Sequence, residues 1–206
     1  MNKNITEFDF GIVRNPRIFQ QNSIMPHSDQ EYYSSEEAAS GEALSDFKYL
    51  LNGLWKFSYA KNPSLAVPRF YSPQVDCHAW DEIRVPAHIQ MEGYDKPQYS
   101  NYEYPWDGLQ AVKPGEIPEA FNPTAQYVKY FTLPEELSGK PVYISFQGAE
   151  SGIALWLNGH YVGYREDTFT QIFVRSCRGP SAAAAVFPSA SRSFRAKRPT
   201  VFPALS

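Results

Sequence analysis

The stretch that decides the fold is "GIALWLNGHYVGY", residues 152 to 164. Apolar and aromatic residues fill both of its halves, and Asn158-Gly159 separates them. Asparagine and glycine tolerate the positive φ angles of a type I′ turn, which is one of the commonest two-residue connections in β-hairpins. The stretch therefore predicts two paired antiparallel strands, with Leu157 and His160 on either side of the turn.

Three further stretches predict strands, because they are short, rich in β-branched and aromatic residues, and bounded by Gly, Pro or Asn. They are "GLWKFSYA" (53 to 60), "AQYVKYFTL" (125 to 133) and "PVYISFQG" (141 to 148). In the last one, Val142, Ile144 and Phe146 alternate with Tyr143 and Ser145, the pattern of a half-buried strand. Helical periodicity is nearly absent, so the sequence predicts an all-β fold, a β-sandwich or jelly roll.

The sequence also predicts where two tryptophans and one short helix lie. Trp55 and Trp156 belong to the strand patterns, and we expect both in the core. The segment "SSEEAASGEAL" allows one helical turn, because Ser34 and Glu37 have the spacing of a capping box and Gly41 limits its length.

Bulk composition excludes several classes of protein. The chain has 206 residues, 43% of them hydrophobic and 16% aromatic, which fits one large globular domain or one medium domain with appendages. A formal charge of −3 gives no support to a nucleic-acid partner. No stretch of about 18 apolar residues exists, so we expect no membrane span. The opening residues lack the apolar core of a signal peptide, so we expect a cytoplasmic protein. The two cysteines and four histidines show no metal-ligand spacing.

The composition changes abruptly near Thr170. Residues 171 to 206 contain six basic residues and no acidic one, although the whole chain contains 22 acidic residues. This tail is rich in Ser, Ala, Pro and Arg and has no sustained period, so we expect it to be disordered. The sequence thus predicts an N-terminal arm (1 to 45), a β-domain (46 to 170) and an unrelated basic tail (171 to 206).

A long loop is expected between Val85 and Phe131, because prolines interrupt it repeatedly. They are Pro86, Pro97, Pro105, Pro114, Pro118 and Pro123. A loop of this length is usually functional or disordered, and its aromatic content argues against disorder. The aromatic residues that need a covering surface are Tyr94, Tyr99, Tyr102, Tyr104 and Trp106.

Several pieces of the chain occur in the order and at the spacing of the N-terminal domain of family 2 glycoside hydrolases, and they resemble the β-galactosidases most closely. They are "LNGLWKFSYA", "VPAHIQMEGYDKPQYSNYEYPW", "FNPTAQYVKYFTLP" and "FQGAESGIALWLNGHYVGYREDTFT". The stretch "NPRIFQQNSIMPHSDQEYY" (15 to 33) resembles the arm that precedes this domain. The resemblance extends from about Asn15 to Thr170.

This resemblance implies a sugar-binding, galactose-binding-like jelly roll at the front of a large, often oligomeric enzyme. Such enzymes hydrolyse terminal non-reducing β-D-galactose residues of β-galactosides. The implied partners are a galactoside sugar and the remaining domains or subunits of the enzyme. A neighbouring activity, such as that of a β-glucuronidase or β-mannosidase, is a weaker alternative, because "GYDKPQYSNYEYP" resembles the galactosidases.

Asn101 is the one substrate-binding residue that the resemblance carries over. In the family, the loop matching "YSNYEYP" reaches the catalytic barrel, and its asparagine helps to hold the galactose hydroxyls. The alternative is a turn residue that bonds its own backbone, and the resemblance favours sugar contact. For the neighbouring aromatic residues, packing that supports the loop is favoured over direct sugar contact. These residues are Tyr99, Tyr102, Tyr104 and Trp106.

No catalytic residue is predicted in this chain. Retaining glycosidases need two carboxyl groups about 5 to 5.5 Å apart. In the family both are glutamates of a (β/α)₈ barrel, which takes about 250 residues, more than this chain contains. Glu166 and Asp167 are adjacent on an expected strand, where neighbours point to opposite faces, so we interpret them as surface charges. The chain offers no metal site of its own, although the parent enzymes commonly use Mg²⁺ and Na⁺.

The composition change after "DTFT" has two explanations. A truncated or frameshifted gene would replace the closing strands of the jelly roll with unrelated sequence, leaving an incomplete sandwich with unpaired strand edges. Alternatively, the tail is a basic arm for an acidic partner, and the chain is a free-standing carbohydrate- or partner-binding module. The first explanation is favoured, and it makes the chain a β-galactosidase fragment that is inactive alone.

Overall fold

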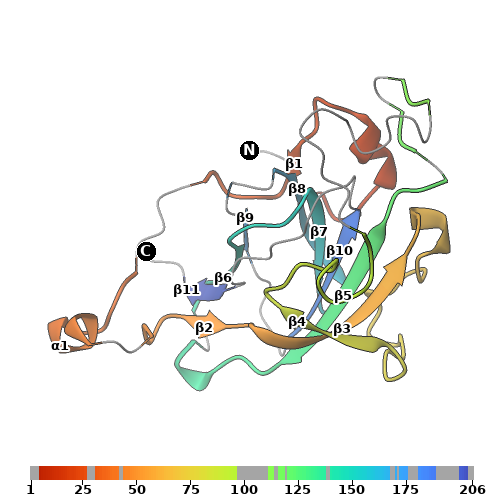
Figure 1. Cartoon of the computed structure of the whole chain (residues 1–206). Coiled ribbons are helices and arrows are strands. Elements are labelled where there is room, and N and C mark those ends of the chain that lie inside the picture. The colour runs from red at the N-terminus through yellow and green to blue at the C-terminus, as the bar shows by residue number, and fades with distance from the viewer. Residues whose placement is uncertain are drawn as a thin grey trace.

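The computed structural model contains two antiparallel β-sheets that pack into a sandwich (Figure 1). It describes residues 5–26, 31–41, 44–96, 111–113, 116–118, 120–137, 140–167 and 170, together with the strands 172–175, 181–188 and 200–203. The predicted all-β class is confirmed.

The larger sheet, here sheet A, has seven strands in the order β1-β8-β7-β10-β5-β3-β4. In chain order they are β1 (Gln20–Gln21), β3 (Gly53–Ala60), β4 (Asp81–Val85), β5 (Thr124–Phe131), β7 (Gly152–Leu157), β8 (His160–Glu166) and β10 (Ser181–Pro188). The smaller sheet, sheet B, has the order β2-β11-β6-β9. Its strands are β2 (Tyr49–Leu50), β6 (Val142–Phe146), β9 (Ile172–Arg175) and β11 (Thr200–Pro203).

Helical structure in the described residues consists of short turns. They are η1 (Phe10–Arg14), α1 (Glu36–Ser40), η2 (Pro63–Leu65) and η3 (Glu135–Leu137). The cap of α1 is Ser35, whose side chain accepts from the Ala38 N–H, so the predicted cap at Ser34 is wrong by one residue. Gly41 ends the helix as expected. No helix among the described residues is long and apolar enough to cross a membrane.

The predicted hairpin is confirmed. Strands β7 and β8 pair antiparallel, and Leu157 lies opposite His160. Asn158 and Gly159 have φ angles of 51° and 83°, as a type I′ turn requires. The turn also packs closely, because a Cβ atom on Gly159 would lie 2.9 Å from Cδ of Pro73.

The other predicted strands form close to their expected positions. Strand β3 has the predicted bounds, whereas β5 and β6 each end two residues earlier than the stretches that predicted them. Val142, Ile144 and Phe146 are buried, as their alternation predicts. Ser145, on the other face of β6, is also fully buried, and its hydroxyl accepts a hydrogen bond of 3.1 Å from Nε2 of Gln147.

The main hydrophobic core, the inter-sheet core, lies between the two sheets. Sheet A contributes Trp55, Phe57 and Tyr127, and sheet B contributes Ile144 and Phe146. The Phe57 and Tyr127 rings meet edge to face with their centroids 4.9 Å apart. Trp55 is 2% exposed and donates its indole N–H to the Leu51 carbonyl, so its predicted core position is confirmed.

A second hydrophobic core, the arm-side core, covers the opposite face of sheet A. Trp156 of β7 lies at its centre and is stacked on Tyr71 with the ring centroids 4.7 Å apart. The irregular N-terminal arm contributes Ile12, which is buried, and Phe8, whose ring contacts Trp156. The arm also pairs with sheet A through β1, where Gln20 lies opposite Arg165. Residues 5 to 26 are therefore part of the folded body.

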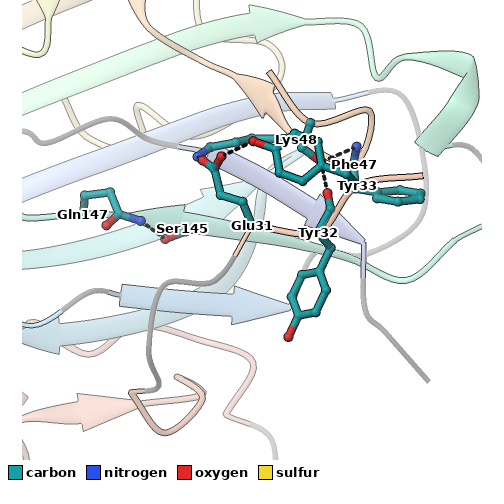
Figure 2. A network of polar contacts seen from close by, with 8 residues as sticks. Glu31, Tyr32, Tyr33, Phe47, Lys48, Ser145 and Gln147 are labelled. Carbon is teal, nitrogen blue, oxygen red and sulfur yellow. Dashed lines mark hydrogen bonds and ion pairs between the residues drawn. The ribbon is translucent and has the colours of Figure 1, made fainter. Parts of the chain in front are cut away.

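A polar network holds the next part of the arm against the start of the β-domain (Figure 2). Lys48 forms an ion pair with Glu31, and the other carboxylate oxygen of Glu31 accepts from the Tyr33 hydroxyl at 2.8 Å. The Ser45 hydroxyl donates to the Tyr32 carbonyl. These bonds bring residues 31 to 33 beside 45 to 48, whereas α1 between them lies away from the sheets at the left of Figure 1.

Three stretches of the tail, which the sequence predicts to be disordered, form strands. Strand β10 lies between β7 and β5 in sheet A, pairing with both, and β9 and β11 flank β6 in sheet B. Side-chain periodicity gave no sign of these strands. These strands pair through hydrogen bonds with the backbone N–H and C=O groups of the neighbouring strands. Such hydrogen bonds do not depend on the side chains of the added strand.

Candidate functional site

The predicted sugar-binding residue and its supporting residues lie outside the described part of the chain. They are Asn101, Tyr99, Tyr102, Tyr104 and Trp106. Their roles remain predictions. The structure does describe the residues that flank this segment, from Pro86 to Lys96 on one side and from 120 to 123 on the other.

The residues before the segment form a compact loop anchored in the inter-sheet core. Ile89 is 2% exposed, and its carbonyl accepts backbone hydrogen bonds from Glu92 and Tyr94 at 3.1 Å. The Tyr94 ring then packs edge to face on Phe57 of β3, with a centroid distance of 4.5 Å. This loop was predicted as irregular and functional, and its described part contains neither helix nor strand.

Two tyrosines fix the end of this loop through acidic side chains. Burial, followed by the charge and hydrogen bond of Asp95, raises the pKa of Tyr59 to about 12. Burial and a hydrogen bond to Asp81 raise the pKa of Tyr94. Both phenols are therefore protonated at neutral pH and act as hydrogen-bond donors. The described chain before the candidate segment is thus held at β3 and at the start of β4.

The residues after the segment return to the same strand. The backbone N–H of Asn122 donates to the carbonyl of Lys61, directly after β3, at 2.8 Å. The Asn122 carbonyl accepts from the Thr124 hydroxyl at 3.2 Å, and both residues are 2% exposed. The described residues on both sides of the segment therefore contact the C-terminal half of β3 or the residue after it.

Among the described residues, four buried polar atoms near this loop have no hydrogen-bond partner. They are Oδ1 of Asn52, Nδ1 of His88, Oε1 of Gln90 and Oδ1 of Asn122. Because Gly53 pairs with Val85, Asn52 lies where the chain leaves β4 for the loop that contains His88 and Gln90. Sequence reasoning did not select these residues, since a polar side chain in a loop gives no sign of its burial or of its unpaired atoms.

The acidic residues at the end of β8, Glu166 and Asp167, form local hydrogen bonds. Oε1 of Glu166 accepts from the Tyr164 hydroxyl at 2.5 Å, and Glu166 is half-buried, so its interpretation as a surface charge is wrong. Asp167 is exposed, and its carboxylate accepts from the Thr170 hydroxyl. Within the described residues, no three His, Cys, Asp or Glu side chains gather in a way that could hold a metal ion.

Comparison with known proteins identifies the family to which this chain belongs. Residues 48–174 match the family described as "Glycosyl hydrolases family 2, sugar binding domain". A β-galactosidase from Halalkalibacterium halodurans is 49% identical over 158 residues, which cover 77% of this chain and 16% of the relative. A β-galactosidase from Clostridium acetobutylicum is 45% identical, with 77% of this chain and 18% of the relative covered. The chain thus spans less than a fifth of the length of these relatives.

Solved structures share the fold. A glycosyl hydrolase family 2 member from Bacteroides cellulosilyticus aligns with a TM-score of 0.53 at 14% identity, over 76% of this chain and 20% of that one. Bacteroides uniformis β-glucuronidase 2 aligns with a TM-score of 0.54 at 16% identity, over 76% and 18%. At this identity the likeness concerns the fold alone. The family match, the β-galactosidase relatives and the sandwich together place this chain in the sugar-binding domain family of the family 2 glycosyl hydrolases.

Proposed function

We propose that this chain acts as the N-terminal sugar-binding part of a β-galactosidase and is inactive alone. The observation that carries the proposal is the match of residues 48–174 to the sugar-binding domain, together with 49% identity to a β-galactosidase. The substrate class is then a β-galactoside with a terminal non-reducing galactose. The partner is the rest of such an enzyme, in the same chain or as another subunit.

The proposed contribution to binding is a hydroxyl contact by Asn101. A carboxamide offers two donors and an acceptor to adjacent sugar hydroxyls, and aromatic faces can cover the apolar side of a sugar ring. The support at β3 favours this role, because a loop held at both flanks loses less conformational entropy when it binds. No catalytic group is assigned to this chain.

The test is hydrolysis of a chromogenic β-galactoside by the purified chain, alone and mixed with a β-galactosidase that lacks its N-terminal domain. We expect no hydrolysis by the chain alone and restored hydrolysis in the mixture. Asn101→Ala should reduce the restored activity, whereas the matched control Asn62→Ala, at the cap of η2, should not. Hydrolysis by the chain alone would contradict the proposal. Sugar binding by the chain alone, without restored activity, would favour a free-standing binding module.

A further inference from the structure

Arg165 places a positive charge on the inner face of sheet A, next to the edge strand β1. In antiparallel strands, directly opposed residues share one face of the sheet. Ala154 and Tyr164 are such a pair, and both belong to the arm-side core. The next pair joins Arg165 to Ile153, which belongs to the inter-sheet core. The Arg165 side chain therefore lies on the inner face of sheet A, beside the edge strand β1.

The guanidinium of Arg165 is buried and incompletely bonded. The residue is 5% exposed, and its Nε atom has no hydrogen-bond partner. Its NH1 group donates to the neutral amide oxygen of Gln20 at 3.3 Å. Among the described residues, no carboxylate forms an ion pair with it. A cation that is removed from water to this degree normally has an anionic partner.

None of the nearby described carboxylates forms an ion pair with Arg165. Glu166 accepts from Tyr164, and Asp167 accepts from Thr170. Glu150 is 9% exposed. Residues 171 to 206 contain no Asp or Glu, so the tail has no carboxylate side chain to offer. Within the described part of the chain, the charge of Arg165 thus has no paired carboxylate.

We propose that Arg165 and Gln20 form an oxyanion-binding position at the β1–β8 edge of sheet A. The planar guanidinium fork matches the two oxygens of a carboxylate or phosphate group, and the free Nε–H is the donor that such a ligand would use. Gln20 is half-buried and its neighbour Phe19 is 52% exposed, so the position lies close to the surface. The oxyanion comes either from a small ion in solution or from a carboxylate side chain of another protein.

The test titrates inorganic phosphate and acetate into the full chain at constant ionic strength, with chloride as the balancing anion. In ¹H-¹⁵N spectra, the Arg165 Nε–H signal, assigned by its loss in Arg165→Gln, should shift and saturate. The thermal midpoint should rise over the same concentration range, because a ligand that binds only the folded state stabilises it. Arg165→Gln should abolish this rise and, without added oxyanion, should unfold no earlier than the wild type.

A matched control is Arg84→Gln, which removes an exposed arginine from β4 at the other edge of sheet A. It should leave the anion-dependent rise unchanged. If small oxyanions do not shift the Nε–H signal but a free Asp-containing peptide does, the source is a protein carboxylate. An unmoved Nε–H signal with every oxyanion, or an equal midpoint rise in Arg165→Gln, would overturn the proposal.

Discussion

Strand β7 has two neighbours in sheet A, and they form for different reasons. On one side β8 follows it through a two-residue turn, and its apolar pattern and Asn-Gly pair predict the pairing. On the other side lies β10, whose residues Ser181–Pro188 come from a tail without periodicity. The first pairing is local and encoded in one short stretch. The second joins residues that are distant in the chain, and only the assembled sheet provides its place.

The two strands differ in what stabilises them. Strand β8 contributes buried side chains to both faces of the sheet, such as Val162 and Tyr164. Strand β10 is in place through backbone pairing with Lys129, Val128 and their neighbours in β5, and with β7 on its other side. Substitutions that remove a buried side chain should therefore lower stability most in the β7–β8 hairpin. Substitutions that remove a backbone hydrogen bond should disrupt the pairing of β10.

Trp156→Ala should have the largest effect, because it empties the centre of the arm-side core. Trp156 is 5% exposed, and its ring contacts Phe8, Phe70 and Tyr71. Large-to-small changes of this kind cost about 3 to 5 kcal/mol. Urea unfolding followed by circular dichroism measures the change. Leu54→Ala, at a 57% exposed position, is the control and should change stability by about 0.5 kcal/mol or less.

Ala184→Pro tests whether backbone pairing holds β10. Ala184 lies opposite Val128 of β5 and Trp156 of β7, in the middle of the strand. Proline removes the N–H donor, and an unpaired buried backbone group costs about 1 to 3 kcal/mol. Hydrogen exchange at the amides of β5 and β7 should become faster.

Ser181→Pro is the matched control, because proline is tolerated at the first residue of a strand. It should leave exchange in β5 and β7 unchanged. If Ala184→Pro behaves like Ser181→Pro, β10 does not hold the sheet together in solution.

Gly159→Ala separates turn strain from packing in the hairpin. A left-handed backbone conformation costs an alanine about 1 to 2 kcal/mol, and the new Cβ would also lie 2.9 Å from Pro73. Gly93→Ala is the matched control, because Gly93 has a φ of 90° with no atom within 4 Å of the added Cβ. Thermal unfolding should show a larger loss for Gly159→Ala. Equal losses would mean that the contact with Pro73 does not matter.

Tyr164→Phe should have the smallest effect on stability, and this effect should be visible only at high pH. Burial, followed by the hydrogen bond to Glu166, raises the pKa of its phenol above the ordinary value of 10.0. The folded state therefore holds this proton more tightly than the unfolded state, so its stabilising effect is complete below about pH 10 and is lost as the pH rises further. Urea unfolding from pH 9 to 11.5 should show a shallower decline for Tyr164→Phe. Parallel curves would contradict this assignment.

Elements with a strong local signal were predictable from the sequence. The bounds of β3, the turn at Asn158 and Gly159, and the burial of Trp55 and Trp156 follow from residue patterns. Other features were not predictable, because their cause lies in distant parts of the chain. The stacking of Tyr71 on Trp156 and the burial of Arg165 beside Gln20 depend on where the loops and the arm meet sheet A.

For the candidate site, the sequence selected Asn101 and its aromatic neighbours, and the structure adds the support of their loop. Tyr94 was expected to need a covering surface, and it packs on Phe57. The hydrogen bond from Asn122 to Lys61 had no signal in the sequence, because it joins a loop residue to a distant strand end.

The sequence by itself determined the all-β class, the hairpin and the family resemblance, because alternation, turn residues and motif order act over a few residues at a time. The tertiary structure alone decided the place of the tail strands, the arm-side core and the burial of Arg165. Each of these depends on contacts between segments separated by many residues, such as Ala184 with Val128 or Phe8 with Trp156. Backbone pairing and burial are properties of the assembled sheets, so no local pattern encodes them.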